Sequence, residues 1–501
     1  MTEKTEVIVA KKTKNVNNGA RREHLRSGRN EGNLSSTIDG IMKRFDPDIL
    51  NMSELIISVA GLRGIIGEAL NPDVAMRYAT AFSATTPPGF FVITRDSRPT
   101  GAMLANAIHA GLNGLGRSTI DAGIAATPTL GVLIRHYGAA GGIQISASHN
   151  PSEFNGMKLF SADGRCIPKA PGSRVLEQYK NGKPLWATHQ HIGTCSVCPD
   201  PNGAHLEAVL KTVNTNAIVK RKFKVLLDAN HGAGAILGAK LLAKLNCTVK
   251  ILGEEPTGEF SHSPEPTPNN LTSVCSTVKS ADVDVAFCQD PDADRLAIID
   301  ANGRYIGEEY TVALCMDHVF HGAAKNGRKP GPMVINCATS RMCEDIAAKH
   351  GVPIFRSAVG EANVVDLMQT KGAAFGGEGN GGPIDPSVGY VRDSFVGMAL
   401  ILDAMATTGK TITELADALP KYALVKHKMT VELASVPALL SKVALAFKHL
   451  PCDRSDGLRI DHGDAWVLIR GSNTEPIIRI FAEAPTAAQA DKLCDEIEDL
   501  V

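Results

Sequence analysis

From Ile56 onward the chain alternates short apolar runs with polar turns and with longer stretches that have helical spacing. The runs are rich in valine, isoleucine and leucine, which is typical of buried strands. The stretch 101–115 and one that starts at Ala235 repeat apolar residues every three or four positions, so they predict helices. The apolar runs that predict strands lie at 55–59, 90–94, 119–122, 141–145, 224–228, 248–252, 283–288, 333–336 and 373–375.

These elements fall into three series that each repeat a strand, a short polar turn and a helix. The third series includes a helix whose N-cap we expect at Thr339 or Ser340, because hydroxyl side chains can accept from the first free amides of a helix. Strands that are joined through helices usually lie side by side in one sheet. The pattern therefore predicts an α/β protein with three tandem domains that have mixed or parallel sheets.

The last part of the chain has a different pattern. His462 and Gly463 form a plausible hairpin turn between two of its apolar runs. The predicted strands lie at 426–433, 458–461, 466–470 and 477–482, and the predicted helices at 436–448 and 487–500. Because few helices separate these strands, the pattern predicts a small α+β fourth domain at the C-terminus.

Residues 1–52 differ from the rest because they are polar, locally basic and almost without periodicity. We expect them to form a disordered N-terminal extension, with a short helix near 36–45 and with Met52 as a possible alternative translational start. The predicted domains are domain I (53–200), domain II (201–304), domain III (305–424) and domain IV (425–501).

The composition limits the classes of function. The 501-residue chain is 44% hydrophobic, 21% charged and 5% aromatic, with a net charge of −1, so it offers no general attraction for nucleic acid or for an anionic membrane. Its 11 cysteines, with no signal peptide and no membrane span, indicate a cytoplasmic protein with reduced thiols. Cys195 and Cys198 could form a zinc site or a redox pair, but ordinary thiols in a loop are the simpler interpretation.

Ser148 follows the apolar run 141–145 and is soon followed by a proline. A serine in this position is presented on a tight loop instead of being buried in an element, and such loops carry the chemistry of α/β proteins. Lys158 could act as a general acid or base or balance phosphate charge, and Arg63 could meet a phosphorylated Ser148. Surface positions are the plainer alternative for these two residues, and 95–99 is predicted to be a structural turn with a salt bridge.

Three aspartates, Asp290, Asp292 and Asp294, alternate after the run 283–288 and are followed by Arg295. Carboxylates at this spacing can converge on one cation, and hard oxygen ligands favour Mg²⁺, which takes its other ligands from water or substrate. A solvated acidic turn is the alternative. A hydroxyl, a metal loop and a phosphate-binding loop together predict phosphoryl transfer through a phosphoserine.

Two later loops carry polar groups that suit a sugar phosphate. Glu378 and Asn380 alternate in a glycine-rich stretch and can face neighbouring sugar hydroxyls. Near the C-terminus, hydroxyl, amide and backbone donors beside arginines can hold a phosphate dianion. A flexible glycine loop and an ordinary hairpin are the respective alternatives. The candidate phosphate-binding residues are Arg470, Ser472, Asn473, Thr474 and Arg479.

Taken in order, these motifs resemble those of the α-D-phosphohexomutase superfamily, from about Ile56 to the C-terminus. Ser146-Ala147-Ser148-His149-Asn150-Pro151 is similar to its phosphoserine loop T-A-S-H-N-P, 290–295 to its D-x-D-x-D-R metal loop, and 470–479 to its phosphate loop. The loop 377–382 lacks the histidine that many members carry. Together with 359–363, it resembles the archaeal-type phosphomannomutase and phosphoglucosamine mutase branch.

The resemblance implies four domains around a central cleft, each of which contributes one loop. It implies a phosphotransferase of the isomerase class that interconverts hexose 1-phosphate and hexose 6-phosphate through phosphorylated Ser148 and a hexose 1,6-bisphosphate. Mg²⁺ would be bound by Ser148 and the three aspartates. His149 and Arg295 would stabilise the transferring group, and Gly360 would join Glu378 and Asn380 in binding the substrate.

We expect phosphomannomutase or phosphoglucomutase activity, with phosphoglucosamine mutase activity as the alternative. The sequence leaves this choice open because the three sugars differ only at C2. A D-x-D phosphatase would use Asp290 as nucleophile and Asp292 as acid or base, which leaves Ser148 without a role. A non-catalytic protein that binds sugar phosphates would need neither the serine nor the aspartates. The expected partners are therefore small hexose phosphates, without nucleic acid or membrane, and the sequence does not indicate an oligomeric state.

Overall fold

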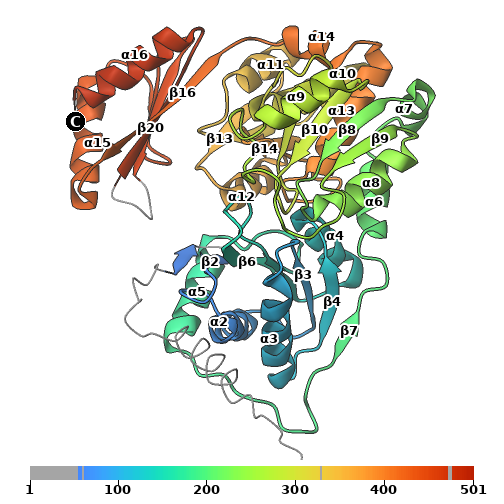
Figure 1. The fold of residues 1–501 in the computed structure, drawn as a ribbon. Helices are drawn as coiled ribbons and strands as arrows, with labels where there is room; N and C mark the ends of the chain where they lie inside the picture. The colour runs from blue at the N-terminus through green and yellow to red at the C-terminus, as the bar shows by residue number, and fades with distance from the viewer. Residues whose placement is uncertain (1–54, 59–60, 326, 328–329, 472–476, 501) are drawn as a thin grey trace, which may run out of the picture. The chain divides into compact units, whose positions relative to one another are not determined.

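The computed structural model describes residues 55–500 apart from 59–60, 326, 328–329 and 472–476 (Figure 1). The predicted extension 1–52, with its helix and Met52, lies outside the described residues. Part of the predicted phosphate-binding loop also lies outside them, namely Ser472, Asn473 and Thr474. The described chain forms four separate sheets.

The first sheet has seven strands and is covered by helices on both faces. Its elements are β1 (Ile56–Ser58), β2 (Gly61–Ile65), β3 (Phe91–Arg95), β4 (Thr119–Ile124), β5 (Gly141–Ile145), β6 (Phe154–Ser161), β7 (Cys195–Val197), α2 (Pro72–Ala84), α3 (Gly101–Gly114), α4 (Thr127–Tyr137) and α5 (Lys169–Asn181). The strand order is β1-β2-β6-β5-β3-β4-β7, with β6 antiparallel to both β2 and β5. Since side chains alternate along a strand, Phe91 and Ile93 pack in one core with α2 and α3, whereas Val92 packs with α4.

The second and third sheets each have four strands and share one apolar core. Their elements are α6 (Gly203–Leu210), α7 (Thr215–Arg221), β8 (Lys224–Asp228), α8 (Gly234–Lys244), β9 (Thr248–Leu252), α9 (Thr272–Ser280), β10 (Val285–Gln289) and β11 (Leu296–Asp300), then α10 (Glu308–Lys325), β12 (Met333–Asn336), α11 (Met342–His350), β13 (Ile354–Ser357), α12 (Glu361–Lys371), β14 (Phe375–Glu378), β15 (Gly382–Ile384), α13 (Ser394–Thr408) and α14 (Ile412–Asp417). The strand orders are β11-β10-β8-β9 and β13-β12-β14-β15, each with one antiparallel edge strand. Phe287, Phe320 and Phe395 join the shared core.

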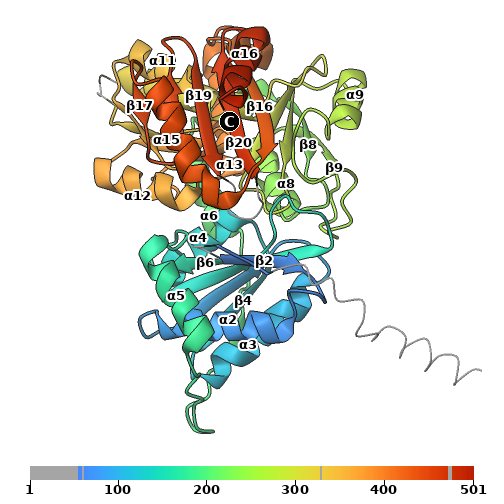
Figure 2. The same cartoon turned by 90° about the vertical axis from the view of Figure 1, so that its left-hand side faces the viewer.

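The fourth sheet is antiparallel and has a core of its own, which includes Ile469, Ile480 and Ile497 (Figure 2). The strand order is β16-β20-β19-β18-β17. Its elements are β16 (Ala423–Thr430), a short 3-10 helix (Leu433–Ser435), α15 (Val436–Ala446), β17 (Cys452–Asp453), β18 (Leu458–Asp461), β19 (Trp466–Gly471), β20 (Ile477–Ala484) and α16 (Ala487–Glu498). The predicted fold class, three α/β units followed by a small α+β unit, is confirmed.

The structure corrects several local predictions. The helix α11 begins at Met342, and its N-cap residue Arg341 makes no side-chain capping bond, but the predicted cap Ser340 accepts from the Met342 amide at 3.2 Å through its hydroxyl. The expected cap Thr339 is used elsewhere, because its hydroxyl bonds to Asn336 and to the amide of Gly379. The stretch around Cys195 was predicted to be a loop and contains strand β7. The strands predicted at 373–375 and 426–433 are shifted to β14 and β16.

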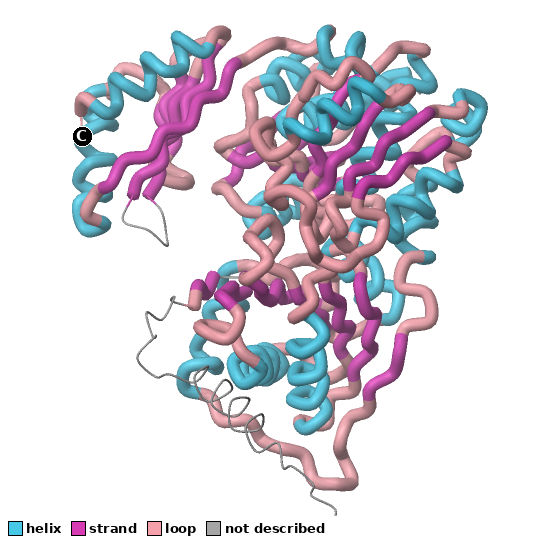
Figure 3. The backbone as a smooth tube through the Cα atoms, in the orientation of Figure 1, coloured by secondary structure: helices cyan, strands magenta, loops and turns pink. Residues whose placement is uncertain are grey.

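Three predicted functional loops each lie at the carboxyl end of a strand, and the three strands belong to three different sheets (Figure 3). Ser148 follows β5, Asp290 follows β10 and Glu378 ends β14. This is the position at which open α/β sheets usually bind ligands. None of the helices in the described part of the chain is both long enough and apolar enough to span a membrane.

Candidate active site

The serine loop after β5 is held in an unusual backbone conformation. Ser148 has a φ of 52°, in the left-handed region that residues with a side chain rarely adopt. Ser146 stabilises this turn, because its hydroxyl accepts from the Ser148 amide at 2.8 Å and donates to Asp96 at 2.7 Å. Asp96 is buried and paired with Arg98 at 3.1 Å, so the predicted salt bridge in the 95–99 turn is confirmed.

The buried Arg98 donates hydrogen bonds to four backbone carbonyls of this loop. Its guanidinium donates to the carbonyl of Ser148 at 2.8 Å and to that of Phe154 at 3.0 Å. It also donates to the carbonyls of Asn150 and Pro151. Because the arginine is buried and donates to the carbonyl of Ser148 and to three later carbonyls, it fixes the course of the backbone that follows Ser148.

The hydroxyl of Ser148 faces the metal loop of the second sheet. Its Oγ donates to Asp290 Oδ2 at 3.0 Å, although the two residues are 142 positions apart. His149 Nδ1 lies 3.5 Å from the same Oγ. The prediction of an outwardly presented serine was only partly right: Ser148 is on the expected loop, but it is 0% exposed, because the metal loop lies against it.

The three predicted aspartates converge. Asp290, Asp292 and Asp294 are all buried, and each offers a carboxylate oxygen within 4.8 Å of the others. Thr127, the first residue of α4, supports the loop by donating its amide to the Asp292 carbonyl at 2.9 Å and its hydroxyl to the Asp292 carboxylate. Lys158 Nζ donates to Asp292 at 2.5 Å and to Asp294 at 2.9 Å. A lysine from β6 therefore balances the charge of two of the aspartates.

Burial and neighbouring charges shift the pKa values of Asp290 and Asp294 in opposite directions. Burial, followed by the charges of Asp294 and Asp292, raises the pKa of Asp290 well above its ordinary value. Burial alone would also raise the pKa of Asp294, but Arg392 and Lys158 outweigh it and lower that pKa. Burial alone would lower the pKa of Lys158, but the two aspartates outweigh it and raise that pKa. The ammonium of Lys158 therefore stays charged at neutral pH.

The donor set fits a hard divalent cation. The Oδ1 atoms of Asp292 and Asp294 are buried and have no hydrogen-bond partner among the described residues. A buried carboxylate oxygen without a partner is costly, and carboxylate oxygens are the ligands that Mg²⁺ prefers. The three carboxylates also leave coordination positions for water or substrate, as is usual for Mg²⁺.

Arg392 connects the metal loop (290–295) with the loop 377–382, which is called here the sugar loop. The sequence did not predict this role for Arg392. Its guanidinium donates to Glu378 at 2.7 Å, to Asp294 at 2.7 Å and to Glu361 at 3.2 Å. In the sequence, Arg392 and Asp393 are the only charged residues in the apolar stretch 386–402. A lone charged pair in such a stretch is a signal of buried ion pairing, because unpaired charges are rarely buried.

The sugar loop is organised around Glu378. One of its oxygens accepts from Asn336 at 2.7 Å and from the amide of Gly360 at 2.8 Å, and the other accepts from Arg392. Asn380 Oδ1 is buried without a hydrogen-bond partner among the described residues, so it is available to a ligand. Gly360, which was predicted to bind substrate, therefore contacts Glu378 directly.

The sugar loop also contacts the strand that follows the metal loop. The amide of Leu296 donates to the carbonyl of Gly381 at 2.9 Å. Gly381 has a φ of +84°, and a Cβ there would lie 2.3 Å from the Leu296 carbonyl oxygen. Only glycine fits both the conformation and the space, so this approach fixes the distance between the two loops.

Two of the predicted phosphate-binding residues, Arg470 and Arg479, lie on the fourth sheet. Arg470 on β19 lies opposite Arg479 on β20 in the ladder. Arg470 Nη2 pairs with Asp456 at 3.2 Å, and Asp456 accepts from the Val359 amide at 3.0 Å. The Nε of Arg470 is buried without a partner among the described residues. These contacts bring the fourth sheet to the segment that precedes α12.

The other predicted cations also lie at this site. Arg295 Nε is 3.8 Å from Asp294 Oδ1, and Arg63 Nη1 donates to Asn150 Oδ1 at 3.2 Å. Burial, followed by the charges of Arg295 and Arg63, lowers the pKa of His149 to about 2. The imidazole of His149 is therefore neutral at physiological pH.

A cavity of about 740 Å³ gathers these groups from all four sheets. It is lined by Arg63 and Lys158 from the first sheet, Asp294 from the second, Gly360 from the third and Arg470 from the fourth. The structure thus brings together side chains that are spread over more than 400 positions of the sequence. This cavity has the size and the charged lining of a site for a small phosphorylated ligand.

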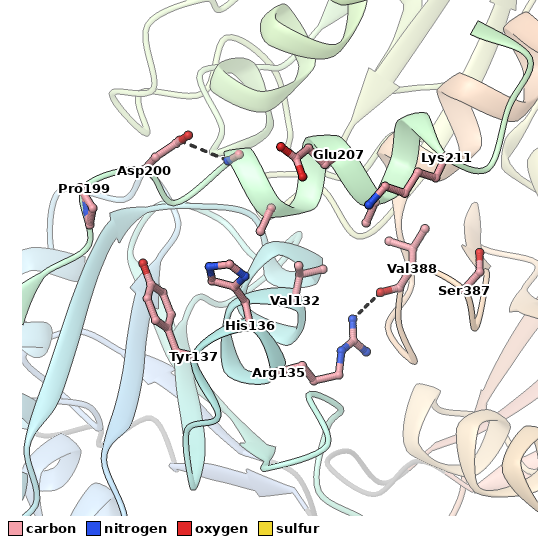
Figure 4. Close-up of a pocket in the computed structure, with 13 residues that line it drawn as sticks. Val132, Arg135, His136, Tyr137, Pro199, Asp200, Glu207, Lys211, Ser387 and Val388 are labelled. Carbon is pink, nitrogen blue, oxygen red and sulfur yellow. Dashed lines mark hydrogen bonds between the residues drawn. The ribbon is translucent and has the colours of Figure 1, made fainter.

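Figure 4 shows a second cavity, of about 680 Å³, between α4, α6 and the segment 387–388. Arg135 crosses its floor and donates to the carbonyl of Val388. Neither the serine loop nor the aspartates line it, so it is separate from the candidate active site.

The four parts of the chain match family models of known enzymes in the same order. Residues 55–185, 203–303 and 308–422 match the α/β/α domains I, II and III of phosphoglucomutase/phosphomannomutase. Residues 422–500 match the C-terminal domain of the same family.

Relatives from archaea match almost the whole chain. The phosphoglucomutase/phosphomannomutase of Thermococcus kodakarensis is 37% identical over 438 residues, which cover 86% of this chain and 94% of the relative. A protein of Methanopyrus kandleri, named as a probable phosphoglucosamine mutase, is 30% identical over 445 residues, 88% of this chain and 96% of the relative.

Two solved structures show the same fold. A phosphoglucomutase/phosphomannomutase family protein from Burkholderia thailandensis has a TM-score of 0.77 at 24% identity, covering 89% of this chain and 97% of that protein. The N-acetylphosphoglucosamine mutase of Aspergillus fumigatus, solved in complex with GlcNAc-6P and magnesium, has a TM-score of 0.50 at 17% identity, covering 82% of each chain.

The four-domain fold and these relatives define an isomerase of the phosphohexomutase class. The chain belongs to the phosphoglucomutase/phosphomannomutase family. The resemblance predicted from the sequence motifs is confirmed, including the similarity to archaeal members of both activities.

Proposed function

We propose that this phosphohexomutase interconverts hexose 1-phosphate and hexose 6-phosphate through a phosphoserine at Ser148 and a hexose 1,6-bisphosphate. One observation carries the proposal: the Ser148 hydroxyl is hydrogen-bonded across two domains to Asp290, beside the aspartate cluster. A nucleophile and a carboxylate cation site in contact are the two parts that phosphoryl transfer requires.

The chain's own residues divide the work of the transfer. In one direction a sugar hydroxyl attacks phosphorus, the bond from phosphorus to Ser148 Oγ breaks, and the proton of that hydroxyl passes to Oγ. In the other direction Ser148 Oγ attacks, the bond from phosphorus to the sugar oxygen breaks, and the proton passes to the sugar oxygen. Lys158 is charged and buried beside the aspartates, so it can give a proton to the leaving sugar oxygen. Arg63, His149 and Arg295 lie around the serine and can donate to the transferring group. Mg²⁺ held by Ser148, Asp290, Asp292 and Asp294 would neutralise the charge that develops there.

The remaining candidates position the sugar. Arg470 and Arg479, together with Ser472, Asn473 and Thr474, would hold the phosphate that does not react. Glu378, Asn380 and Gly360 would bind the sugar. Binding at a remote phosphate fixes the reacting hydroxyl in line with phosphorus, and such positioning can contribute several kcal/mol, on the order of 7–11 at the upper limit.

The proposed substrates are small hexose phosphates, with mannose and glucose phosphates first. The T. kodakarensis relative supports this choice by the activity for which it is named, and the M. kandleri relative supports glucosamine phosphate as the alternative. The A. fumigatus complex supports both the ligand class and the magnesium.

We also propose boundaries for the four domains and a cellular compartment. We propose domain I at 53–200, domain II at 201–304, domain III at 305–424 and domain IV at 425–501, which the four separate sheets support. All 11 cysteines lie in the described part of the chain and are free thiols, which supports a reducing compartment such as the cytoplasm.

The test is the detection of phosphate on Ser148. Protein incubated with Mg²⁺ and glucose 1,6-bisphosphate should carry one acid-stable phosphate on the peptide that contains Ser148, and Ser148→Ala should lose both the phosphate and the mutase activity. Ser152→Ala, an exposed serine of the same loop, is the matched control and should keep both. An acid-labile phosphate on Asp290 would instead indicate a phosphatase-like enzyme and would exclude the serine mechanism.

The sugar is settled by a second assay. Glucose-, mannose- and glucosamine-1-phosphate are compared at matched concentrations, and kcat/KM is measured for each. We expect the glucose and mannose substrates to react with higher kcat/KM than glucosamine-1-phosphate, and the reverse order would favour the alternative activity.

A further inference from the structure

The segment 185–197, called here the apolar edge, exposes an unusual set of side chains. Seven large apolar residues are exposed in the described part of the chain, and four of them lie in this segment: Leu185, Trp186, Ile192 and Val197. Leu185 and Val197 are 89% and 79% exposed, more than the other five. A concentration of exposed apolar residues in one segment of a folded protein is a candidate interaction surface.

The apolar edge also lacks charge. From Pro184 to Pro199 the sequence contains no aspartate, glutamate, lysine or arginine, in a chain that is 21% charged. Natural proteins usually protect exposed strand edges by keeping them short or by placing proline, lysine or other charged residues on them, because an open edge pairs readily with another strand. β7 is short, with three residues, but it carries neither proline nor a charged residue.

The apolar edge ends in an open strand. β7 is the last strand of the first sheet, and it pairs in parallel with β4 on one side. Among the described residues no strand pairs with its other side, and all three of its residues are exposed. Its outer backbone groups are therefore available to a further strand.

Backbone hydrogen bonds hold the apolar edge in place, so it is not a loose connection. The amide of Ala187 donates to Gly114 at 2.8 Å, and the amide of Gly193 donates to Asn113 at 2.9 Å. The ring of Trp186 lies 3.1 Å from the position of a Cβ on Gly114. The surface is thus formed before any partner binds, which lowers the entropy cost of binding.

Nothing in the mutase reaction uses this segment. The family models for domains I and II match residues 55–185 and 203–303, which leaves 186–202 between them. The residues that line the cavity of the candidate active site do not include any from 185–197. The segment therefore needs an explanation that is separate from the proposed function.

We propose that the apolar edge is the docking surface for a second copy of this chain, in which β7 pairs antiparallel with its counterpart across a two-fold axis. A two-fold interface places each surface against itself, so like charges would repel. A surface without charges avoids this repulsion, and it offers no complement to a charged partner. The pairing would join two seven-stranded sheets and cover the apolar side chains of both copies.

Cys195 gives this arrangement a distinctive signature. It is an exposed thiol at the start of β7, and Cys452 in the fourth sheet is an exposed thiol far from it in the sequence. In an antiparallel pair centred on the middle residue of β7, the two Cys195 Cα atoms would be about 8 Å apart, given strands about 4.8 Å apart and a rise of about 3.3 Å per residue. A short cross-linker should therefore join them.

The first test measures oligomeric state. By sedimentation velocity or light scattering, the full chain should be a dimer at micromolar concentration, and Val197→Lys should raise the dissociation constant by at least ~10-fold. Leu445→Lys changes an equally apolar exposed residue on α15 and should stay dimeric. Both variants should keep the wild-type thermal midpoint and mutase activity. A monomeric wild type, or a Val197→Lys variant that dimerises as well as wild type, would overturn the proposal.

The second test locates the contact. A bis-maleimide that spans about 8–13 Å should give a covalent dimer with wild type and with Cys452→Ser, but not with Cys195→Ser. A covalent dimer that persists in Cys195→Ser and disappears in Cys452→Ser would place the interface elsewhere and would refute pairing through β7.

Discussion

Two charged residues that lie between loops decide how the site is held together. Arg392 contacts three carboxylates and Lys158 contacts two, and both side chains are mostly buried. Removing one partner of a buried ion pair leaves the other partner's charge without compensation, which costs more free energy than the pair itself contributes. Both residues can therefore be tested by deletion of their charge.

Arg392→Met should lower the free energy of unfolding by ~3–5 kcal/mol, because it leaves Asp294, Glu361 and Glu378 without their shared partner. Chemical denaturation measures this change. Arg77→Met removes an exposed arginine that pairs with Asp73 and should cost less than ~1 kcal/mol. Equal losses for the two variants would mean that the buried network contributes little to stability.

Lys158→Met should bind Mg²⁺ more tightly than wild type and should be catalytically impaired. The reason is that the ammonium occupies oxygens of Asp292 and Asp294 that a divalent cation would otherwise share. Calorimetric titration with Mg²⁺ and the coupled mutase assay give the two readings. Lys169→Met, which changes a lysine of the same cavity, is the control. Weaker Mg²⁺ binding in Lys158→Met would show that the lysine supports the ion and does not compete with it.

At the scale of the elements, the sequence predicted the positions of most strands, but it did not predict the contacts between elements that lie far apart in the chain. β5, β8, β9, β12 and β18 have the predicted bounds, although Gln144, Lys250 and Arg459 interrupt the apolar runs of β5, β9 and β18. β7 was missed because three residues, all exposed, leave no burial pattern. The contact of Arg392 with the metal loop could not be predicted either, since sequence periodicity reports which face of an element is buried and says nothing about which distant loop covers it.

The pairing of β16 with α16 should make the stability of the fourth sheet depend on pH. His427 on β16 is hydrogen-bonded to Glu498 on α16 at 2.8 Å, and this bond raises its pKa above the ordinary value. The extra stability is fully present below the unfolded-state pKa of about 6.5 and is lost as the pH rises through the raised, folded-state pKa.

His427→Gln should therefore lower the thermal midpoint at about pH 6 and have little effect at about pH 9. Thermal unfolding of both proteins across this range is the measurement. His449→Gln changes an exposed histidine after α15 and should show no such dependence on pH. A deficit of His427→Gln that grows towards high pH would contradict the assignment of the ion pair.

At the scale of the whole molecule, the cavity exists only because four sheets each contribute a loop. Arg470 shows this dependence, since it reaches the cavity from the C-terminal sheet and contacts the third sheet's segment through Asp456. The four loops and their order along the chain were predictable from motifs. The distances between them were not, because they follow from close contacts such as that of Gly381 with Leu296.

Arg470→Ala should raise KM for hexose phosphates by ~10–100-fold with a smaller effect on kcat, because a charged hydrogen bond is worth ~1.5–3 kcal/mol. Steady-state kinetics with glucose 1-phosphate measures both constants. Arg454→Ala removes an exposed arginine of the same sheet that does not line the cavity, and it should leave KM unchanged. An unaltered KM in Arg470→Ala would remove the C-terminal loop from substrate binding.

The hydrogen bonds from Arg98 to the serine loop have a consequence for the reaction cycle. In the proposed mechanism, the oxygen that carries phosphorus keeps one position relative to the first sheet, because the amide of Ser148 is bonded to Ser146 and its carbonyl to Arg98. The enzyme therefore cannot swing its nucleophile from one end of the sugar to the other, and the bisphosphorylated sugar has to make the half-turn itself. A sugar that escapes midway takes the enzyme's only phosphate with it, so each escape leaves an idle molecule that fresh bisphosphate must recharge.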